Sequence, residues 1–208
     1  MEELGPEVPD LTLPAIDGGT RTLASFLAPA GTRGAVVAFW SGVCSHCARY
    51  DGYLRDFSGS RPELALVGVA SRQGETAADL RRVTAERRLG FPLLHDAGRA
   101  VAAEWRVAQT PRVFLVDGGG NGDDGEAGPD GDGGEAGGWD GGAGVGPRLL
   151  YRGAIDNFKY PEDPAYEAYL EPAIEAFLAG RPVPRMESPS FGCPVESVYY
   201  TLPGPLRR

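Results

Sequence analysis

Short apolar runs alternate along the chain with longer stretches in which apolar residues recur every three or four positions. The runs at 35–40, 64–70, 112–117 and 149–153 are rich in aliphatic, β-branched and aromatic residues, which predicts four strands. The run at 64–70 is apolar on both faces, as expected of a strand that is buried inside a sheet.

Three longer stretches, at 45–57, 75–89 and 165–178, have the spacing of amphipathic helices. Gly90 follows the second stretch, and we expect it to end that helix in the left-handed conformation. The stretch 8–27 alternates around a turn and predicts an N-terminal β-hairpin. The order of these elements predicts an α/β domain with a central mixed sheet flanked by helices and extended by the hairpin.

The segment 118–147 interrupts this pattern between two predicted strands. It holds 15 of the 31 glycines and seven acidic residues, without a Lys or Arg. Such a segment cannot bury enough apolar surface to offset the entropy of ordering it, so we expect it to be disordered. We therefore predict one domain over 1–182, which carries this insert in a β-hairpin, and a Pro-rich tail over 183–208.

The formal net charge of −9 argues against a nucleic-acid partner. The first residues lack the basic and apolar regions of a signal peptide, and no segment approaches the roughly 20 apolar residues of a membrane span. These features predict a cytoplasmic protein without a membrane partner. Because disulfides are rarely structural in a reducing compartment, a Cys-x-x-Cys motif there is more typical of catalysis or metal binding.

Cys44 and Cys47 form such a motif, directly after the first predicted strand. We expect Cys44 at the N-terminus of the following helix, where unpaired N–H groups and the helix dipole stabilise a thiolate. Cys47 would lie one turn further along, within reach of a disulfide with Cys44. Structural zinc takes four ligands, and the chain has one motif of this kind, so we expect no metal. The other possible ligands are scattered: His46, His95 and Cys193.

A strand ending in Phe39-Trp40, the Cys-x-x-Cys motif, a helix, and Thr110-Pro111 before a later strand together resemble the thioredoxin fold. The stretches 8–13 and 91–96 are similar to the redoxin branch of that fold, which comprises the AhpC/TSA and TlpA-like proteins. The resemblance covers 8–180 apart from the glycine-rich insert.

The motif Cys44-Ser45-His46-Cys47 is similar to the Cys-Asn-His-Cys of a subgroup of small bacterial redoxins, which also carry a Gly-Cys near the C-terminus. The resemblance implies a thiol–disulfide oxidoreductase that acts on protein or low-molecular-weight thiols. It implies that Cys44 attacks as a thiolate and that Cys47 resolves the mixed disulfide. The disulfide between them would be the redox group, with no further cofactor.

The resemblance also implies roles for residues around the two cysteines. Pro111 would be cis and lie opposite the motif, where it presents the Thr110 backbone to an incoming peptide and keeps metal off the sulfurs. Trp40 would pack beside the disulfide or serve as ordinary core. His46 would stabilise the thiolate and raise the reduction potential above about −270 mV, or be a solvated loop residue.

The sequence leaves open the role of Cys193 and the identity of one proton acceptor. Cys193 is either a free thiol on a loose tail or a third redox thiol that pairs with Cys44 or Cys47 when the tail folds back. The proton acceptor for the resolving step is unassigned, because Ala38 stands where thioredoxin has an Asp, and the nearby Asp51 has no assigned orientation.

Two other functions are alternatives. A thiol peroxidase would keep Ser41 three residues before a peroxidatic Cys44, but Val37 replaces the Pro of that motif and its Arg is displaced to Arg112. Peroxide attack needs those donors to polarise the O–O bond. The third possibility is a redox-inactive binding module that uses the same fold as a scaffold.

Overall fold

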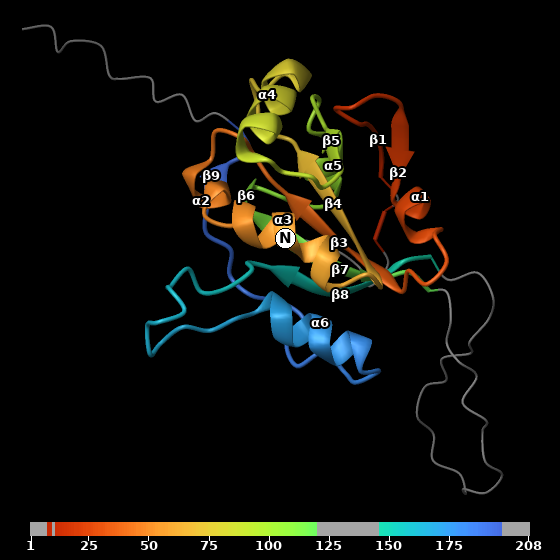
Figure 1. The fold of residues 1–208 in the computed structure, drawn as a ribbon, viewed down its shortest axis with the longest axis vertical. Helices are drawn as coiled ribbons and strands as arrows, with labels where there is room; N and C mark the ends of the chain where they lie inside the picture. The colour runs from red at the N-terminus through yellow and green to blue at the C-terminus, as the bar shows by residue number, and fades with distance from the viewer. Residues whose placement is uncertain (1–7, 10, 120–145, 197–208) are drawn as a thin grey trace, which may run out of the picture.

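Five strands form the central sheet: β3 (Gly34–Phe39), β4 (Leu64–Ala70), β5 (Leu93–His95), β7 (Arg112–Asp117) and β8 (Arg148–Gly153). Their order is β5-β4-β3-β7-β8 in the computed structural model, which describes residues 8–9, 11–119 and 146–196 (Figure 1). β4 is parallel to β3 and β5, whereas β7 is antiparallel to β3 and β8. The predicted mixed sheet is confirmed.

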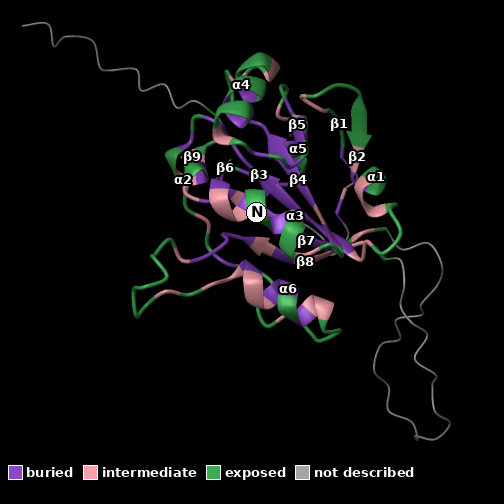
Figure 2. Ribbon diagram, viewed as in Figure 1, coloured by how far each residue is buried: buried purple, intermediate pink, exposed green. Residues whose placement is uncertain are grey.

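Helices cover both faces of this sheet, and each face has its own buried cluster. β3 alternates between them, with Val36 facing the first cluster and Val37 the second, and all six of its residues are buried (Figure 2). Leu54 and Ile174 bring helices to the first cluster, and Leu23 brings one to the second. The helices on the face of the first cluster are α3 (Asp51–Ser60), α4 (Ala77–Arg87) and α6 (Leu170–Leu178). Those on the face of the second cluster are α1 (Leu23–Leu27) and α5 (Ala100–Glu104).

The predicted N-terminal hairpin is also present. It consists of β1 (Thr12–Pro14) and β2 (Thr20–Thr22), which pair antiparallel. The Ile16 N–H donates to the Leu93 carbonyl oxygen at 3.0 Å, so the hairpin docks against the β5 edge of the sheet.

The predicted continuous helix over 45–57 is wrong, because the structure breaks it into α2 (Ser45–Ala48) and α3. The Tyr50 N–H donates to the Cys47 carbonyl oxygen, three residues back, which closes α2 after a single turn. The Tyr50 hydroxyl donates to Asp156 at 2.6 Å, and this buried bond ties the break to the loop after β8. The pattern of apolar residues carries no information about that bond.

Two other helix ends differ from prediction. Arg88, not Gly90, takes the left-handed conformation after α4, with φ 55°, because Leu89 then turns into the core. The helix expected from residue 165 begins at Leu170. Pro172 has no N–H and fits only the first turn of a helix, so the start lies just before it.

The segment 118–147 joins β7 and β8, which pair antiparallel as expected of a hairpin. Most of the predicted disorder, at 120–145, and the end of the tail, at 197–208, lie outside the described residues. The described part of the tail packs on the domain, where β9 (Cys193–Pro194) pairs with β6 (Gln109–Thr110). Within the described ranges, no helix has the length and apolar character needed to cross a bilayer.

Candidate redox site

The two cysteines of the motif lie where β3 leads into α2. The Trp40 N–H still belongs to the sheet and donates to the Val69 carbonyl oxygen at 2.9 Å. Cys44 is the N-cap of α2, and its carbonyl oxygen accepts bonds from the N–H groups of Cys47 and Ala48, both at 3.1 Å. The strand–turn–helix therefore forms as predicted and leaves the two residues one turn apart.

The surroundings of Cys44 favour its thiolate. Its pKa is lowered to about 4, first because the Cys47 side chain donates a hydrogen bond to the sulfur. The thiol and N–H of Cys193 and the N–H of Cys47 also lower this pKa, while burial raises it. When protonated, the Cys44 thiol donates to the Thr110 carbonyl oxygen at 3.2 Å, and this hydrogen bond stabilises the neutral thiol. The hydrogen bonds from Cys47 and Cys193 outweigh burial, so the net direction is downward.

Cys47 has the opposite surroundings. Burial raises its pKa above the ordinary value, and the hydrogen bond to Cys44 and the charge there raise it further. The Thr110 hydroxyl and the Ser41 backbone act the other way and are weaker. Cys47 therefore keeps its proton while Cys44 is ionised, and it donates that proton as the hydrogen bond that holds the thiolate.

The opposite wall of the site is the turn at β6. The Thr110–Pro111 peptide bond is cis, as the resemblance implied. Thr110 is fully buried, and its carbonyl oxygen is the atom that faces the Cys44 sulfur. This backbone lies opposite the motif, and its strand edge is already occupied by β9.

Cys193 comes to the same place from the end of the described chain. It pairs with Thr110 across β6 and β9, and its thiol and its N–H are among the groups that lower the pKa of Cys44. Burial raises its own pKa, and the hydrogen bond to Cys44 does so as well. The structure therefore brings together three reduced cysteines, of which Cys44 is 1% exposed and Cys193 is partly exposed.

The His46 ring stacks on Phe158, with ring centroids 4.8 Å apart and an interplanar angle of 24°. Its Nδ1 atom is buried without a hydrogen-bond partner. Arg49 lies over the rings of Phe158 and Tyr160. The histidine is thus packed into an aromatic and cationic cluster beside α2, and its backbone donates to the Cys193 sulfur.

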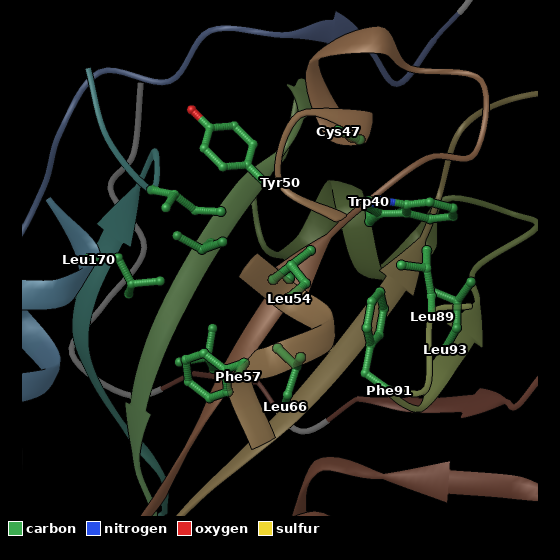
Figure 3. Close-up of a cluster of buried hydrophobic side chains, with 14 of the residues drawn as sticks. Trp40, Cys47, Tyr50, Leu54, Phe57, Leu66, Leu89, Phe91, Leu93 and Leu170 are labelled. Atoms are coloured by element: carbon green, nitrogen blue, oxygen red, sulfur yellow. The ribbon is translucent and has the colours of Figure 1, made fainter. Parts of the chain in front are cut away.

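Trp40 is fully buried and shares a cluster with Cys44, Cys47 and Tyr50. Figure 3 shows Trp40, Cys47 and Tyr50 among the buried side chains of this cluster. Its Nε1–H donates to the Asp51 carboxylate at 2.9 Å, and the other oxygen of that carboxylate accepts from Arg87 at 3.0 Å. Arg87 also donates to the Gly42 carbonyl oxygen at 2.7 Å. Asp51 thus supports the turn before Cys44 through Trp40 and Arg87, an orientation that the sequence left open.

Glu75 is a second supporting residue that the sequence did not reveal. Its carboxylate accepts a bond from the Gly42 N–H at 2.7 Å, beneath the loop that carries Val43 into Cys44. Burial raises the pKa of Glu75, while Ser41 and the N–H groups of Gly42 and Val43 lower it. Its position just before α4 gave no sequence signal, because the contact spans 33 residues.

The two residues that a peroxidase would use are engaged elsewhere or buried. Ser41 is fully buried. Arg112 donates to Ser190 at 3.0 Å and pairs with Glu187, both in the tail. In the described residues, no group of three or more His, Cys, Asp or Glu side chains is placed to hold a metal ion.

The profile of the AhpC/TSA family matches residues 4–121, more than half of the chain. The chain belongs to the AhpC/TSA family. This membership agrees with a redoxin fold and a redox site at Cys44, and the narrower likeness to a Cys-x-His-Cys subgroup stays a prediction. A comparison with curated proteins found no match.

Solved structures resemble this AhpC/TSA chain over nearly its whole length. A hypothetical protein from Sinorhizobium meliloti 1021 is 26% identical, with a TM-score of 0.70 over 94% of each chain. An uncharacterized conserved protein from Geobacillus kaustophilus is 21% identical, with a TM-score of 0.71 over 97% of this chain and 95% of that one. These neighbours share the fold, and their descriptions state no activity.

Proposed function

We propose that the chain is a thiol–disulfide oxidoreductase in which Cys44 and Cys47 exchange a disulfide with protein or low-molecular-weight thiols. The observation that carries this proposal is the opposite tuning of two sulfurs one helical turn apart: the pKa of Cys44 is lowered and that of Cys47 is raised. An ionised, nucleophilic sulfur beside a protonated reserve is the arrangement that two-step exchange requires.

The proposed reaction begins with attack of the Cys44 thiolate on one sulfur of a substrate disulfide. A Cys44–substrate disulfide forms and one substrate thiolate leaves. Cys47 then attacks the Cys44 sulfur, the Cys44–substrate bond breaks, and the proton of Cys47 passes to the leaving substrate sulfur, which gives the Cys44–Cys47 disulfide and the second substrate thiol. The two cysteines supply both electrons, so we propose no further cofactor. The Thr110–Pro111 backbone would hold the substrate sulfur, and Trp40, which is fully buried, would pack behind the two cysteines.

The test is turnover of insulin or oxidised glutathione by the wild type, Cys44→Ser and Cys47→Ser. We expect Cys44→Ser to abolish turnover, and Cys47→Ser, with Cys193 also replaced by Ser, to stop at a Cys44–substrate mixed disulfide. The reduction potential, measured in a glutathione buffer, should lie above about −270 mV because the reduced form holds a stabilised thiolate. Turnover by Cys44→Ser, or failure of the wild type to form the Cys44–Cys47 disulfide under oxidant, would rule out the proposal.

Reduction of a peroxide is the second candidate, because the chain belongs to the AhpC/TSA family. The engagement of Arg112 with the tail weighs against it. Peroxide consumption, with Cys44→Ser as control, separates the two activities. Rapid consumption together with a sulfenic acid at Cys44 would favour the peroxidase.

A further inference from the structure

β9 pairs with the edge of β6, the short strand whose Thr110 faces the candidate site. It pairs antiparallel with β6, with Thr110 opposite Cys193. The pairing continues past β9, because the Val195 N–H donates to the Ala108 carbonyl oxygen at 3.0 Å. On its other side, the Val195 carbonyl oxygen accepts from the Gln73 N–H at 2.9 Å. The pairing has the geometry of β-strand addition, in which an extended peptide pairs with an exposed strand edge. Here the added strand belongs to the same chain.

The segment that leads to β9 is fastened to the domain. Ser188 is buried, and its hydroxyl bonds with the Tyr151 hydroxyl at 2.6 Å and accepts from the Ala154 N–H at 3.1 Å. Glu187 pairs with Arg152 at 2.8 Å and also with Arg112. These contacts hold the tail before β9 in a defined position, so its docking does not depend on Cys193 alone.

Gly192 shows how closely the tail approaches the site. A Cβ atom at this position would overlap the Thr110 carbonyl oxygen and crowd the Pro111 nitrogen. The backbone of the tail therefore lies directly against the turn that faces Cys44, and a residue with a side chain does not fit there without displacement.

The tail also carries the most exposed of the three sulfurs. Cys44 is 1% exposed and Cys47 is fully buried, whereas Cys193 is partly exposed. Thr110 faces the Cys44 sulfur through its carbonyl oxygen and is also the strand partner of Cys193, so the partly exposed Cys193 lies beside the buried Cys44. A substrate strand would place its own sulfur at this point, opposite Thr110.

We propose that β9 is a built-in substrate strand, and that Cys193 exchanges with the Cys44–Cys47 disulfide to give a Cys44–Cys193 disulfide. This inference rests on the proposed function. In the exchange, the Cys193 sulfur attacks the Cys44 sulfur, the Cys44–Cys47 bond breaks, and the proton of Cys193 passes to the Cys47 sulfur. No electrons enter or leave. An outside thiol then attacks Cys193, the exposed end of the new disulfide.

The experiment uses the full chain with Cys47→Ser, reduced and then treated with oxidised glutathione. Glutathione first couples to Cys44 and is then displaced by Cys193, which releases a second reduced glutathione. Peptide mapping should find a Cys44–Cys193 disulfide in at least about tenfold excess over glutathionylated Cys44, because an internal thiol has a high effective concentration. Persistent glutathione on Cys44 with a free Cys193 thiol would overturn the inference.

A second variant tests the position of the strand without changing any thiol. Adding Gly192→Ala to Cys47→Ser should displace β9, reduce the Cys44–Cys193 disulfide about tenfold and leave glutathione on Cys44. The matched control is Gly98→Ala, where an added Cβ meets no atom within 4 Å and the disulfide should form as before. Equal amounts of the disulfide with Gly192→Ala and Gly98→Ala would contradict the role of the strand.

Oxidation of the wild type distinguishes a failure of this inference from a failure of the proposed function. If the wild type forms a Cys44–Cys47 disulfide but Cys47→Ser forms no Cys44–Cys193 disulfide, the inference fails and the oxidoreductase stands. If neither disulfide forms under oxidant, the proposed function fails and the inference with it.

Discussion

The two sides of the candidate site are built from very different lengths of chain. One side is a continuous stretch from Trp40 to Asp51, in which a strand, a turn and a helix start follow one another. The other side joins β6 to β9, so that Thr110 lies opposite Cys193, a residue far along the chain. The first side supplies the reactive sulfurs, and the second covers them.

The reactivity of Cys44 and the access to it depend on different segments of the chain. The largest cause that lowers the Cys44 pKa is Cys47, from the continuous side. The atoms that cover Cys44 come from the other side, where its thiol faces the Thr110 carbonyl oxygen and Cys193. A reactive thiol can therefore be built locally, whereas control over what reaches it requires segments that meet only in the folded chain.

The largest expected effect concerns ionisation on the continuous side. At pH 6 a thiol of ordinary pKa is ionised to about one part in a thousand, whereas Cys44, with a pKa of about 4, is almost fully ionised. Its alkylation rate by iodoacetamide should change less than about twofold between pH 6 and 8 and fall below pH 5. The urea-unfolded chain is the control, and its rate should rise about a hundredfold over the same range. A rate for folded Cys44 that still climbs between pH 6 and 8 would contradict the lowered pKa.

The next effect concerns the support beneath the continuous side. Asp51→Ala removes the acceptor of the Trp40 Nε1–H and the partner of Arg87, and should lower the free energy of unfolding by about 2–3 kcal/mol. Asp56→Ala on the same helix is the matched control. The Asp56 side chain is 78% exposed, so its loss should change the unfolding free energy by less than about 0.5 kcal/mol. Urea titration measures both, and similar values for the two variants would show that the Asp51 contacts contribute little.

A smaller effect is expected on the distant side. Ser188→Ala removes bonds to Tyr151 and Ala154 and should weaken docking of the tail by about 1–2 kcal/mol. Amide exchange at Cys193 and Val195 should accelerate by roughly 5- to 30-fold, while exchange in β4 stays unchanged. The control is Ser60→Ala, on an exposed face of α3. Unchanged exchange at Val195 would mean that Ser188 does not anchor the tail.

The smallest effect links the two sides. Cys193→Ala removes one thiol donor from the Cys44 thiolate and should raise the pKa of Cys44, by less than Cys47→Ala does. The ultraviolet absorbance of the thiolate, followed against pH, measures both shifts. A Cys44 pKa that stays the same or falls in Cys193→Ala would remove Cys193 from the causes of the lowered pKa.

Much of the fold follows from local pattern. The strands predicted at 64–70 and 112–117 match β4 and β7, and the strand–turn–helix at the motif forms where it was expected. Hydrophobic periodicity is a local property, so it locates elements that are stabilised by burial on one or both faces. It failed at Tyr50, where a bond to Asp156, 106 residues away, accompanies a break in the helix.

The candidate site also contains some residues that the sequence predicted and some contacts that it did not. Cys44, Cys47 and the cis Thr110–Pro111 bond could be anticipated from the residues and their resemblance to a family. The partners of Asp51 could not, because its contact with Arg87 joins elements that are adjacent only in the fold. Gly192 shows the limit most clearly, since the sequence displays a glycine and not the carbonyl oxygen that it must clear.

Local residue pattern was enough to predict the main strands and helices, to place two cysteines at a strand–helix turn, and to indicate the chemistry of such a pair. The atoms that face those sulfurs were set by the fold, because strand pairing and side-chain contacts between distant segments are selected by packing of the whole chain. The position of Cys193 opposite Thr110 is the clearest case, since it depends on the tail docking along β6.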